Sequence, residues 1–371
     1  MRCIIHVALG CLVLLLGACK KEVEKIVIQD KVYSWAPSGG LYGNQQIILN
    51  MTKDANSLYL QHPNLMTTVS PTPALTSASG GRYVYGASTG FSSDVNLRLP
   101  MSAAFIATPS LDTLVYLIRP REPLSSLSAT RIRLRQLDPL ALGIVPNSVI
   151  NQEAFGAIDR HNYLLFSYYS SNRSSLRFVL SQVELQPFGT GAVLQAKSRT
   201  VSIPRTILST NSTVRWIIAV DDYFLVNCED EGLFKVREDG SFKRVFGPNY
   251  TDTCYKWQGT VYLVESSSSI LKSTDDGETW QRYTNTPDAF NASTYHVVSD
   301  SLVGVKHGLV NLLYTLRWNG TSYRLRELKS DGLGQGRLTG LEQLGDTVYI
   351  GTTGGLYKRP LSQFFESRPK L

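Results

Sequence analysis

Gly86-Ala87-Ser88-Thr89-Gly90 holds a residue with the potential for nucleophilic chemistry, because the stretch fits the G-x-S-x-G pattern of a nucleophile elbow. That chemistry needs the serine on a sharp turn between a strand and a helix. Here the stretch follows Tyr83-Val84-Tyr85 in a region of strand and turn composition, and no helical pattern comes after it. The sequence therefore favours a Gly/Ser loop over a catalytic serine.

Metal-ligating residue types are present, but their spacing matches no established site. The histidines beyond residue 18 are His62, His161, His296 and His307. They are dispersed and form no H-x-x-x-H pair, so a zinc site is not expected. Asp221-Asp222 and Glu229-Asp230-Glu231 flank one strand and have the chemistry to bind calcium, yet they lack EF-hand spacing. We predict solvated loop acids, no metal and no cofactor.

The sharpest motif is Ser273-Thr274-Asp275-Asp276-Gly277-Glu278-Thr279-Trp280, which fits S-x-D-x-G-x-T-W. Its residue types suit a turn between two strands. The oxygens of Ser273 and Asp275 can bond free loop amides, and Gly277 allows a positive φ. Thr279 begins the returning strand. We therefore predict that Asp275 holds a turn, rather than serving as a catalytic or calcium-binding carboxylate.

This motif resembles the Asp-box of bacterial sialidase-type β-propellers (BNR repeats), and the resemblance covers one hairpin. It implies a propeller in which the motif is structural and points away from the ligand face, with the Trp280 ring buried between adjacent blades. A weaker version stands upstream at Lys235-Val236-Arg237-Glu238-Asp239-Gly240.

The same resemblance raises the hypothesis of an enzyme. Sialidases use an arginine triad on the substrate carboxylate, a Tyr–Glu nucleophile pair, an acid/base Asp and an Arg-Ile-Pro element. The nearest matches to that element, Arg119-Pro120-Arg121 and Ile203-Pro204-Arg205, do not fit, and no spacing identifies the triad. We favour a protein without a recognisable catalytic site and keep a divergent glycoside hydrolase or lyase as the alternative.

The first residues form an export signal. Arg2 supplies its positive start, and the apolar run Ile4–Leu16 is too short to span a bilayer as a helix. The run ends in Leu16-Gly17-Ala18-Cys19, which resembles a bacterial lipobox. That resemblance implies cleavage before Cys19 and acylation of this residue. We predict a signal peptide over residues 1–18 and stable membrane anchoring through Cys19.

Residues 19–30 are charged and are predicted to tether the lipid to one domain over residues 31–371. Lys20, rather than Asp, follows the cysteine, and by resemblance to enteric lipoproteins this implies the outer membrane of a bacterial cell envelope; the leaflet stays open. Without residues 1–18 the formal net charge falls from +7 to +6, and Lys and Arg are scattered among acids. Nucleic acid is not an expected partner.

Two of the five cysteines, Cys228 and Cys254, lie within the predicted domain. An exported compartment permits disulfides. A loop of this length would contribute about 3.5 kcal/mol of stability in the chain-entropy model. We predict a Cys228–Cys254 disulfide and keep two buried free thiols as the alternative.

An internal repeat organises the second half of the chain. Three stretches each hold an apolar strand, a few small or polar residues and a second strand that opens apolar-apolar-Lys. They are Phe224–Lys235, Val261–Lys272 and Val348–Lys358. The lysines are spaced by 37 and then 86 residues, and Leu302–Tyr314 fills the gap. A period of about forty residues suits a four-stranded propeller blade.

Weaker copies continue upstream at Leu58–Leu60, followed by Tyr83–Tyr85, and at Leu114–Ile118 and Tyr163–Tyr168. We therefore predict an all-β protein, a β-propeller of seven blades, with six or eight as alternatives. A single sandwich with an appended module is the alternative architecture. Ile26–Trp35 is predicted to pair with the last blade and close the ring, because an open ring exposes sheet edges.

The longest insertions fall between Leu60 and Arg215, and long loops on a rigid scaffold tend to carry function. We predict that they form the ligand site. Because Arg and Tyr are enriched at binding hot spots, the candidate contacts are Arg119, Arg121, Tyr168, Tyr169 and Arg173. The leading hypothesis is a lipid-anchored, non-catalytic protein that binds a glycan or a protein. An envelope scaffold or assembly factor is a further alternative.

Overall fold

A computed structural model describes residues 33–39, 46–53, 57–62, 65–69, 75–77, 88–89, 102–105, 114–118, 130–144, 156–189, 191–206, 214–228, 230–248, 251–265, 269–284, 294–306, 311–319, 323–334 and 336–368. The chain divides into two units, Met1–Tyr33 and Ser34–Leu371. The predicted signal peptide and tether, Cys19 included, lie outside the described residues, as do Arg119, Arg121 and Tyr83–Tyr85.

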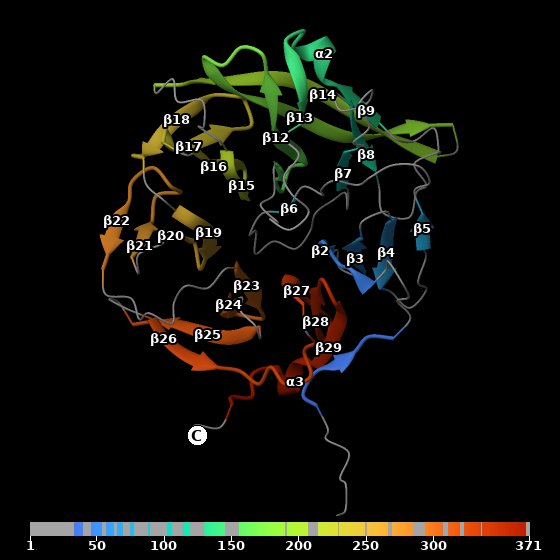
Figure 1. The fold of residues 1–371 in the computed structure, drawn as a ribbon, viewed down its shortest axis with the longest axis vertical. Helices are drawn as coiled ribbons and strands as arrows, with labels where there is room; N and C mark the ends of the chain where they lie inside the picture. Colours follow the sequence, from blue (N-terminus) through green and yellow to red (C-terminus); the bar gives the residue numbers. More distant parts are fainter. Residues whose placement is uncertain are drawn as a thin grey trace, which may run out of the picture. The chain divides into compact units, whose positions relative to one another are not determined.

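The second unit is all-β, and its sheets follow one another around a ring (Figure 1). Five of the described sheets have four strands each. Four of them are simple meanders, and three of these follow one another in the chain. The first of the three holds β15 (Val214–Val220), β16 (Tyr223–Cys228), β17 (Gly232–Arg237) and β18 (Phe242–Phe246). The second holds β19 (Thr251–Trp257), β20 (Thr260–Glu265), β21 (Ile270–Ser273) and β22 (Gln281–Tyr283), and the third holds β23 (Thr294–Val298), β24 (Ser301–Lys306), β25 (Leu312–Trp318) and β26 (Tyr323–Glu327).

The other two four-stranded sheets meet where the chain ends and begins. One is the meander β2 (Asn50–Lys53), β3 (Leu58–Gln61), β4 (Leu65–Val69) and β5 (Leu75–Ser77). The other joins β27 (Leu338–Leu344), β28 (Thr347–Thr352) and β29 (Gly355–Pro360) to the N-terminal β1 (Ala36–Pro37). The predicted repeat is therefore confirmed as strands of neighbouring blades.

The early region is less regular. A six-stranded sheet holds β14 (Gly191–Pro204), β13 (Ser175–Phe188), β12 (Tyr163–Ser170), β11 (Gly156–Ile158) and β6 (Ser88–Thr89), with β10 (Ala141–Ile144) also paired to β12. A three-stranded sheet holds β7 (Ser102–Phe105), β8 (Leu114–Ile118) and β9 (Thr130–Arg133). The described helices, α2 (Leu134–Leu137) and α3 (Leu361–Phe364), are four residues each. The prediction of an all-β propeller is confirmed; the count of seven blades is not, because among the described strands only five sheets have the regular four-stranded form.

Two-residue turns fix the first hairpin of four consecutive blades. Each turn begins with a residue in the left-handed region: Asp221 (φ 52°), Gln258 (φ 48°), Ser299 (φ 50°) and Gly345 (φ 57°). Such turns match the twist of antiparallel strands, and Gly and Asp tolerate the conformation. Asp221-Asp222 is therefore a hairpin turn.

Apolar side chains from two neighbouring sheets fill each seam between blades. Leu225 packs with Leu263 in one cluster, and Val264 packs with Leu302 in the next. Burial of these faces is the main stabilising contribution, at about 25 cal/mol per Å² of apolar surface. Such clusters join the described sheets in series from the six-stranded sheet, through the last sheet, to the β2–β5 sheet.

The predicted Cys228–Cys254 disulfide is not formed, and both residues are buried free thiols. A side chain of a strand points to one of the two faces of its sheet. Cys228 of β16 points into the seam with the six-stranded sheet. Cys254 of β19 lies in the seam on the other side of the β15–β18 sheet. Burial also raises the pKa of each thiol.

An N-terminal segment does pair with the last sheet, through Ala36 opposite Lys358. The pairing lies just beyond the predicted Ile26–Trp35, of which residues 26–32 are outside the described part of the chain. Trp35 is 1% exposed, and its Nε1 donates to the Lys329 carbonyl at 3.1 Å. Its ring meets Phe364 edge-on, with centroids 6.0 Å apart. This buried anchor holds the closing strand.

Candidate functional site

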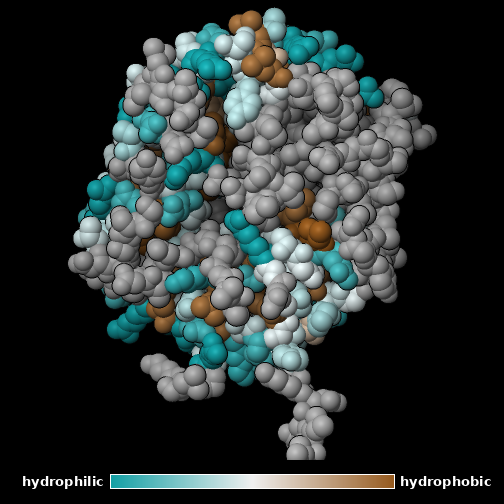
Figure 2. Space-filling model, in the orientation of Figure 1, coloured by the Kyte–Doolittle hydropathy of each residue, from teal (hydrophilic) through white to brown (hydrophobic). Residues whose placement is uncertain are grey.

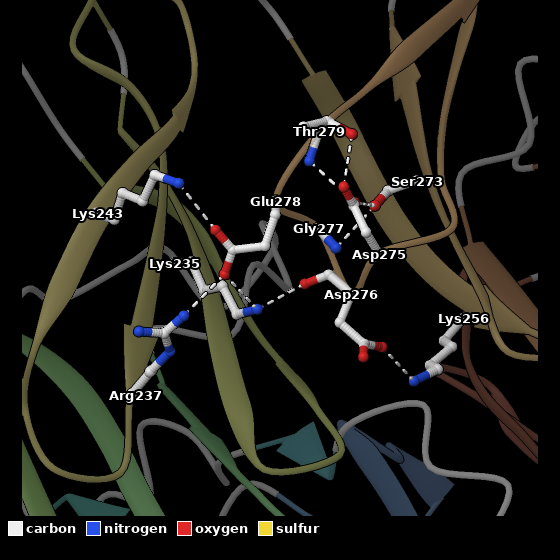
Figure 3. A network of polar contacts seen from close by, with 10 residues as sticks. All are labelled: Lys235, Arg237, Lys243, Lys256, Ser273, Asp275, Asp276, Gly277, Glu278 and Thr279. Carbon is white, nitrogen blue, oxygen red and sulfur yellow. Dashed lines mark hydrogen bonds and ion pairs between the residues drawn. The ribbon is translucent and has the colours of Figure 1, made fainter.

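The turn between β21 and β22, residues 273–280, is held by hydrogen bonds among its own residues (Figure 3). Ser273 Oγ donates to Asp275 Oδ1 at 2.7 Å and accepts from the Gly277 amide at 2.7 Å. The amide and hydroxyl of Thr279 donate to the two oxygens of Asp275, at 2.9 and 2.6 Å. Both oxygens of the Asp275 carboxylate are thus engaged inside the turn.

Backbone conformation and charge suit this arrangement. Asp276 and Gly277 both adopt positive φ, 55° and 82°. Hydrogen bonds from Thr279, and then from Ser273, hold the pKa of Asp275 below its usual value. The turn therefore keeps an ionised carboxylate as its internal acceptor.

The outer side of the same turn forms ion pairs with the neighbouring blade. The Glu278 carboxylate accepts from Lys235 at 2.9 Å, Arg237 at 2.8 Å and Lys243 at 3.0 Å, all from the β15–β18 sheet. The hydrogen bonds from Lys235 and Lys243 lower the pKa of Glu278 to about 2. Lys235 is buried and also lies over the Tyr223 ring, 4.2 Å from its centroid.

Two further contacts tie the turn to the seam. Lys256 of β19 pairs with Asp276 at 3.0 Å and with Asp221 of the preceding blade. The Trp280 ring packs on the apolar cluster shared by the two sheets. As Figure 3 shows, the carboxylates of Glu278 and Asp276 face lysine and arginine side chains of the protein itself, whereas that of Asp275 faces into the turn. Their chemistry is that of fixed hydrogen-bond acceptors.

A second polar contact crosses the preceding seam. Asp159, after β11, is 2% exposed, and its Oδ1 accepts the amides of His161 and Tyr163 at 2.9 and 2.8 Å. Burial, together with the nearby carboxylate of Glu238 in the β17–β18 turn, raises the pKa of Asp159 to about 8. His161 Nδ1 lies 2.5 Å from Glu238 Oε1, and Arg199 donates to the Glu238 carbonyl. Two carboxyl groups and a histidine therefore meet at this seam.

The loops weighed as calcium sites have protein partners. Asp222 faces Arg160 at 3.5 Å, and buried Glu231 accepts from the Thr206 amide at 2.9 Å. Glu229 lies outside the described residues. Within the described ranges, no three His, Cys, Asp or Glu side chains are grouped so that they could hold a metal ion. Ser88 of the G-x-S-x-G stretch starts strand β6, which pairs in parallel with β11.

The predicted ligand residues separate into different environments. Tyr168 is 4% exposed, and its hydroxyl donates to Asp138 at 2.8 Å inside an apolar cluster. It therefore contributes to the core and is not presented to a ligand. Tyr169, its neighbour in β12, is 46% exposed, and Arg173 lies exposed in the turn that follows β12.

An exposed apolar and basic surface surrounds Tyr169. Leu140 is 49% exposed and Leu142 55% exposed. Strand register places Gly143 opposite Tyr169, and Ser171 donates to the Leu140 carbonyl at 2.9 Å. Exposed arginines stand in the chain before and after β10: Arg131, Arg133 and Arg135 in β9 and α2, of which α2 contacts β10, and Arg173 after β12. We call the set of Leu140, Leu142, Tyr169 and these arginines the β10 corner. In Figure 2, apolar surface lies beside hydrophilic surface at the top, where α2 lies in Figure 1.

Of this corner, the sequence analysis predicted only Tyr169 and Arg173 as surface contacts. The stretch Arg131-Ile132-Arg133-Leu134-Arg135 alternates basic and apolar residues with the period of a strand, which indicates one basic, exposed face. Ile132 and Leu134 are buried in the cluster beneath, and the arginines face outward. The exposure of Leu140 and Leu142 depends on the irregular pairing of β10 with β12, which no local pattern indicates.

No protein-family model matches the chain, and no curated protein matches it in sequence. Solved structures match its fold. One of the mitotic checkpoint complex has a TM-score of 0.53 at 9% identity, over 90% of this chain and 97% of that chain. The extracellular domain of a hybrid two-component system from B. thetaiotaomicron has a TM-score of 0.50 at 15% identity, over 88% of this chain and 42% of that chain. BamB from Moraxella catarrhalis has a TM-score of 0.45 at 8% identity, over 85% and 86% of the two chains.

This chain therefore spans less than half of the B. thetaiotaomicron chain that it matches. At these identities the likeness concerns the fold alone. The protein belongs to the class of β-propellers, as its own sheets define. Across the described ranges, no helix has the length and apolarity to cross a membrane.

Replacing Asp275 with alanine removes the acceptor of three hydrogen bonds within the turn. We expect the melting temperature to fall by roughly 2–5 °C, as for the loss of a capping side chain. Thr274→Ala, at an exposed neighbouring position, is the control and should leave it unchanged. Equal melting temperatures for Asp275→Ala and the unmodified protein would contradict the structural role of this carboxylate.

Replacing Asp159 with asparagine should alter the pH dependence of stability. The folded protein holds the proton of Asp159 up to a pKa of about 8, whereas the unfolded chain releases it near 3.9. The stabilisation from that proton is complete below pH ~4 and is lost as the pH rises toward 8. The neutral asparagine avoids this loss.

We therefore expect Asp159→Asn to have the larger free energy of unfolding at pH 8, by roughly 1–3 kcal/mol, and nearly the same value at pH 4. Denaturant unfolding at the two pH values measures the difference. Asp300→Asn, in the exposed β23–β24 turn, should follow the unmodified protein. Parallel pH profiles for all three proteins would contradict the proton on Asp159.

Proposed function

We propose that the protein is a lipid-anchored, non-catalytic β-propeller of the bacterial cell envelope that binds a glycan or protein ligand. The observation that carries the proposal is Leu16-Gly17-Ala18-Cys19, placed directly after a short apolar run. The folded unit begins at Ser34, so a short segment separates Cys19 from the propeller. We place the anchor in the outer membrane because Lys20 follows the cysteine.

We also propose that the propeller is of the sialidase-type Asp-box kind and has seven blades. The hydrogen bonds of residues 273–280 support the first part, since Ser273, Asp275, Gly277 and Thr279 each make the contact their type suits. The irregular six-stranded and three-stranded sheets support the second, because they bring the number of described sheets from five to seven. In this proposal they are blades enlarged by insertions.

The ligand surface is proposed to lie on the early sheets. Tyr169 and Arg173, two of the residues predicted from sequence, stand on exposed parts of the β10 corner. Exposed Leu, Tyr and Arg side chains are suited to contact with a partner protein. This favours a protein partner, and with it a scaffold role in the envelope, as the second candidate function.

Metabolic labelling with a fatty-acid analogue tests the anchor. The unmodified protein should incorporate the label, and Cys19→Ser should incorporate none, because the variant lacks the acylated thiol. Retention of the label by the variant would refute lipidation at this residue. The membrane fraction of cells provides a second reading, in which the variant should be depleted.

Capture of ligands on a glycan array and by pull-down tests the binding role. The protein used is residues 20–371, which keeps every described strand. Once a ligand is captured, Tyr169→Ala combined with Arg173→Ala should lower the affinity for it by about tenfold. Phe242→Ala, at an exposed aromatic on β18, is the matched control and should leave the affinity unchanged. Hydrogen-exchange protection confined to residues 230–360 would contradict a site on the early sheets.

A further inference from the structure

Leu140 and Leu142 project apolar side chains from a fixed backbone. The Asp138 carboxylate accepts the Leu140 amide at 2.9 Å and the Tyr168 hydroxyl at 2.8 Å. The Leu140 carbonyl in turn accepts the Ser171 amide at 2.9 Å and the Ser170 hydroxyl at 3.2 Å. The two leucines are nevertheless about half exposed. Apolar side chains that a constrained backbone keeps in water are unfavourable in free energy, and contact with a partner surface would remove this cost.

Within the described residues 130–144, the exposed charges have one sign. Residues 130–144 contain three arginines, and all three are exposed. The single acid in the stretch is Asp138, which is 8% exposed and engaged by Leu140 and Tyr168. Arg173 adds a further exposed cation next to β12. The surface that meets the solvent is therefore basic around an apolar tip.

We propose that the β10 corner docks on the anionic surface of a lipid bilayer, with Leu140 and Leu142 entering the interface and Arg133, Arg135 and Arg173 contacting lipid phosphates. Apolar side chains flanked by arginines are the composition that binds this boundary, since both the apolar and the electrostatic contributions are favourable there. The exposed charges of residues 130–144 are all positive, which matches an anionic bilayer, and a soluble ligand at the same corner is the competing outcome of the test.

The corner binds the bilayer by itself, and the proposed Cys19 anchor, on which the membrane setting rests, strengthens that contact. A lipid tether turns it into an intramolecular event at high effective concentration. The segment from Cys19 to Ser34 can extend to about 50 Å, which keeps the propeller close to the membrane. In Figure 1, β1 and α2 lie at opposite ends of the ring.

Co-sedimentation of residues 20–371 with vesicles tests the corner without the anchor. The vesicles are phosphatidylglycerol mixed with phosphatidylethanolamine, and phosphatidylcholine alone. We expect binding to the anionic vesicles only, and weaker binding as salt is added. Leu140→Ser with Leu142→Ser should reduce the bound fraction by about tenfold, and Arg133→Gln with Arg135→Gln should remove most of its salt dependence.

The control is Arg317→Gln with Arg324→Gln, an exposed arginine pair that lies opposite one another on β25 and β26. It should bind as the unmodified protein does, and melting curves should show that all variants are folded. The proposal is overturned by a lack of binding to anionic vesicles, by equal binding to both vesicle types, or by corner variants that match the control. If the corner variants lose affinity for a captured soluble ligand but still bind vesicles as the unmodified protein does, the corner is the site of that ligand instead. Fatty-acid labelling of Cys19 is measured in a separate experiment, so its outcome is distinguishable from the outcome of vesicle binding.

Discussion

The seam between neighbouring blades is the constraint on which the rest of the structure depends. A radial sheet has two apolar faces, and both must be covered, so no blade is stable without neighbours on either side. Leu225 and Leu263 supply the apolar part of one seam. Glu278, held by three cations of the next blade, supplies the polar part. The acidic and basic side chains of this turn therefore hold two blades together.

The last sheet of the ring must also be completed and covered. The last sheet lacks an outer strand of its own, and the segment that begins the folded unit fills the place through Ala36 and Pro37. Trp35 fixes it by burial, and Arg359 bridges the same region by donating to the Lys329 carbonyl at 3.1 Å and to Glu366 at 3.0 Å. The ring is therefore closed by the part of the chain that leads directly to the proposed anchor.

Local sequence patterns predicted what depends on local contacts. The strands of the late blades were found from their apolar runs, and the closing segment was predicted to within a few residues. Features set by strand direction were missed. The Cys228–Cys254 disulfide was wrong because the two side chains face different seams, which cysteine spacing does not reveal. Tyr168 and Tyr169 looked equivalent in sequence, yet alternation along β12 buries the first and exposes the second.

A double-mutant cycle between Lys235 and Glu278 measures whether the 273–280 turn stabilises the seam. Lys235→Met, Glu278→Gln and the double variant are compared with the unmodified protein by denaturant unfolding at neutral pH. Each single change should lower the free energy of unfolding, and the coupling between them should be about 1 kcal/mol or more, because Lys235 is buried. A coupling of zero would contradict this stabilising role and show that the turn and the next blade are energetically independent.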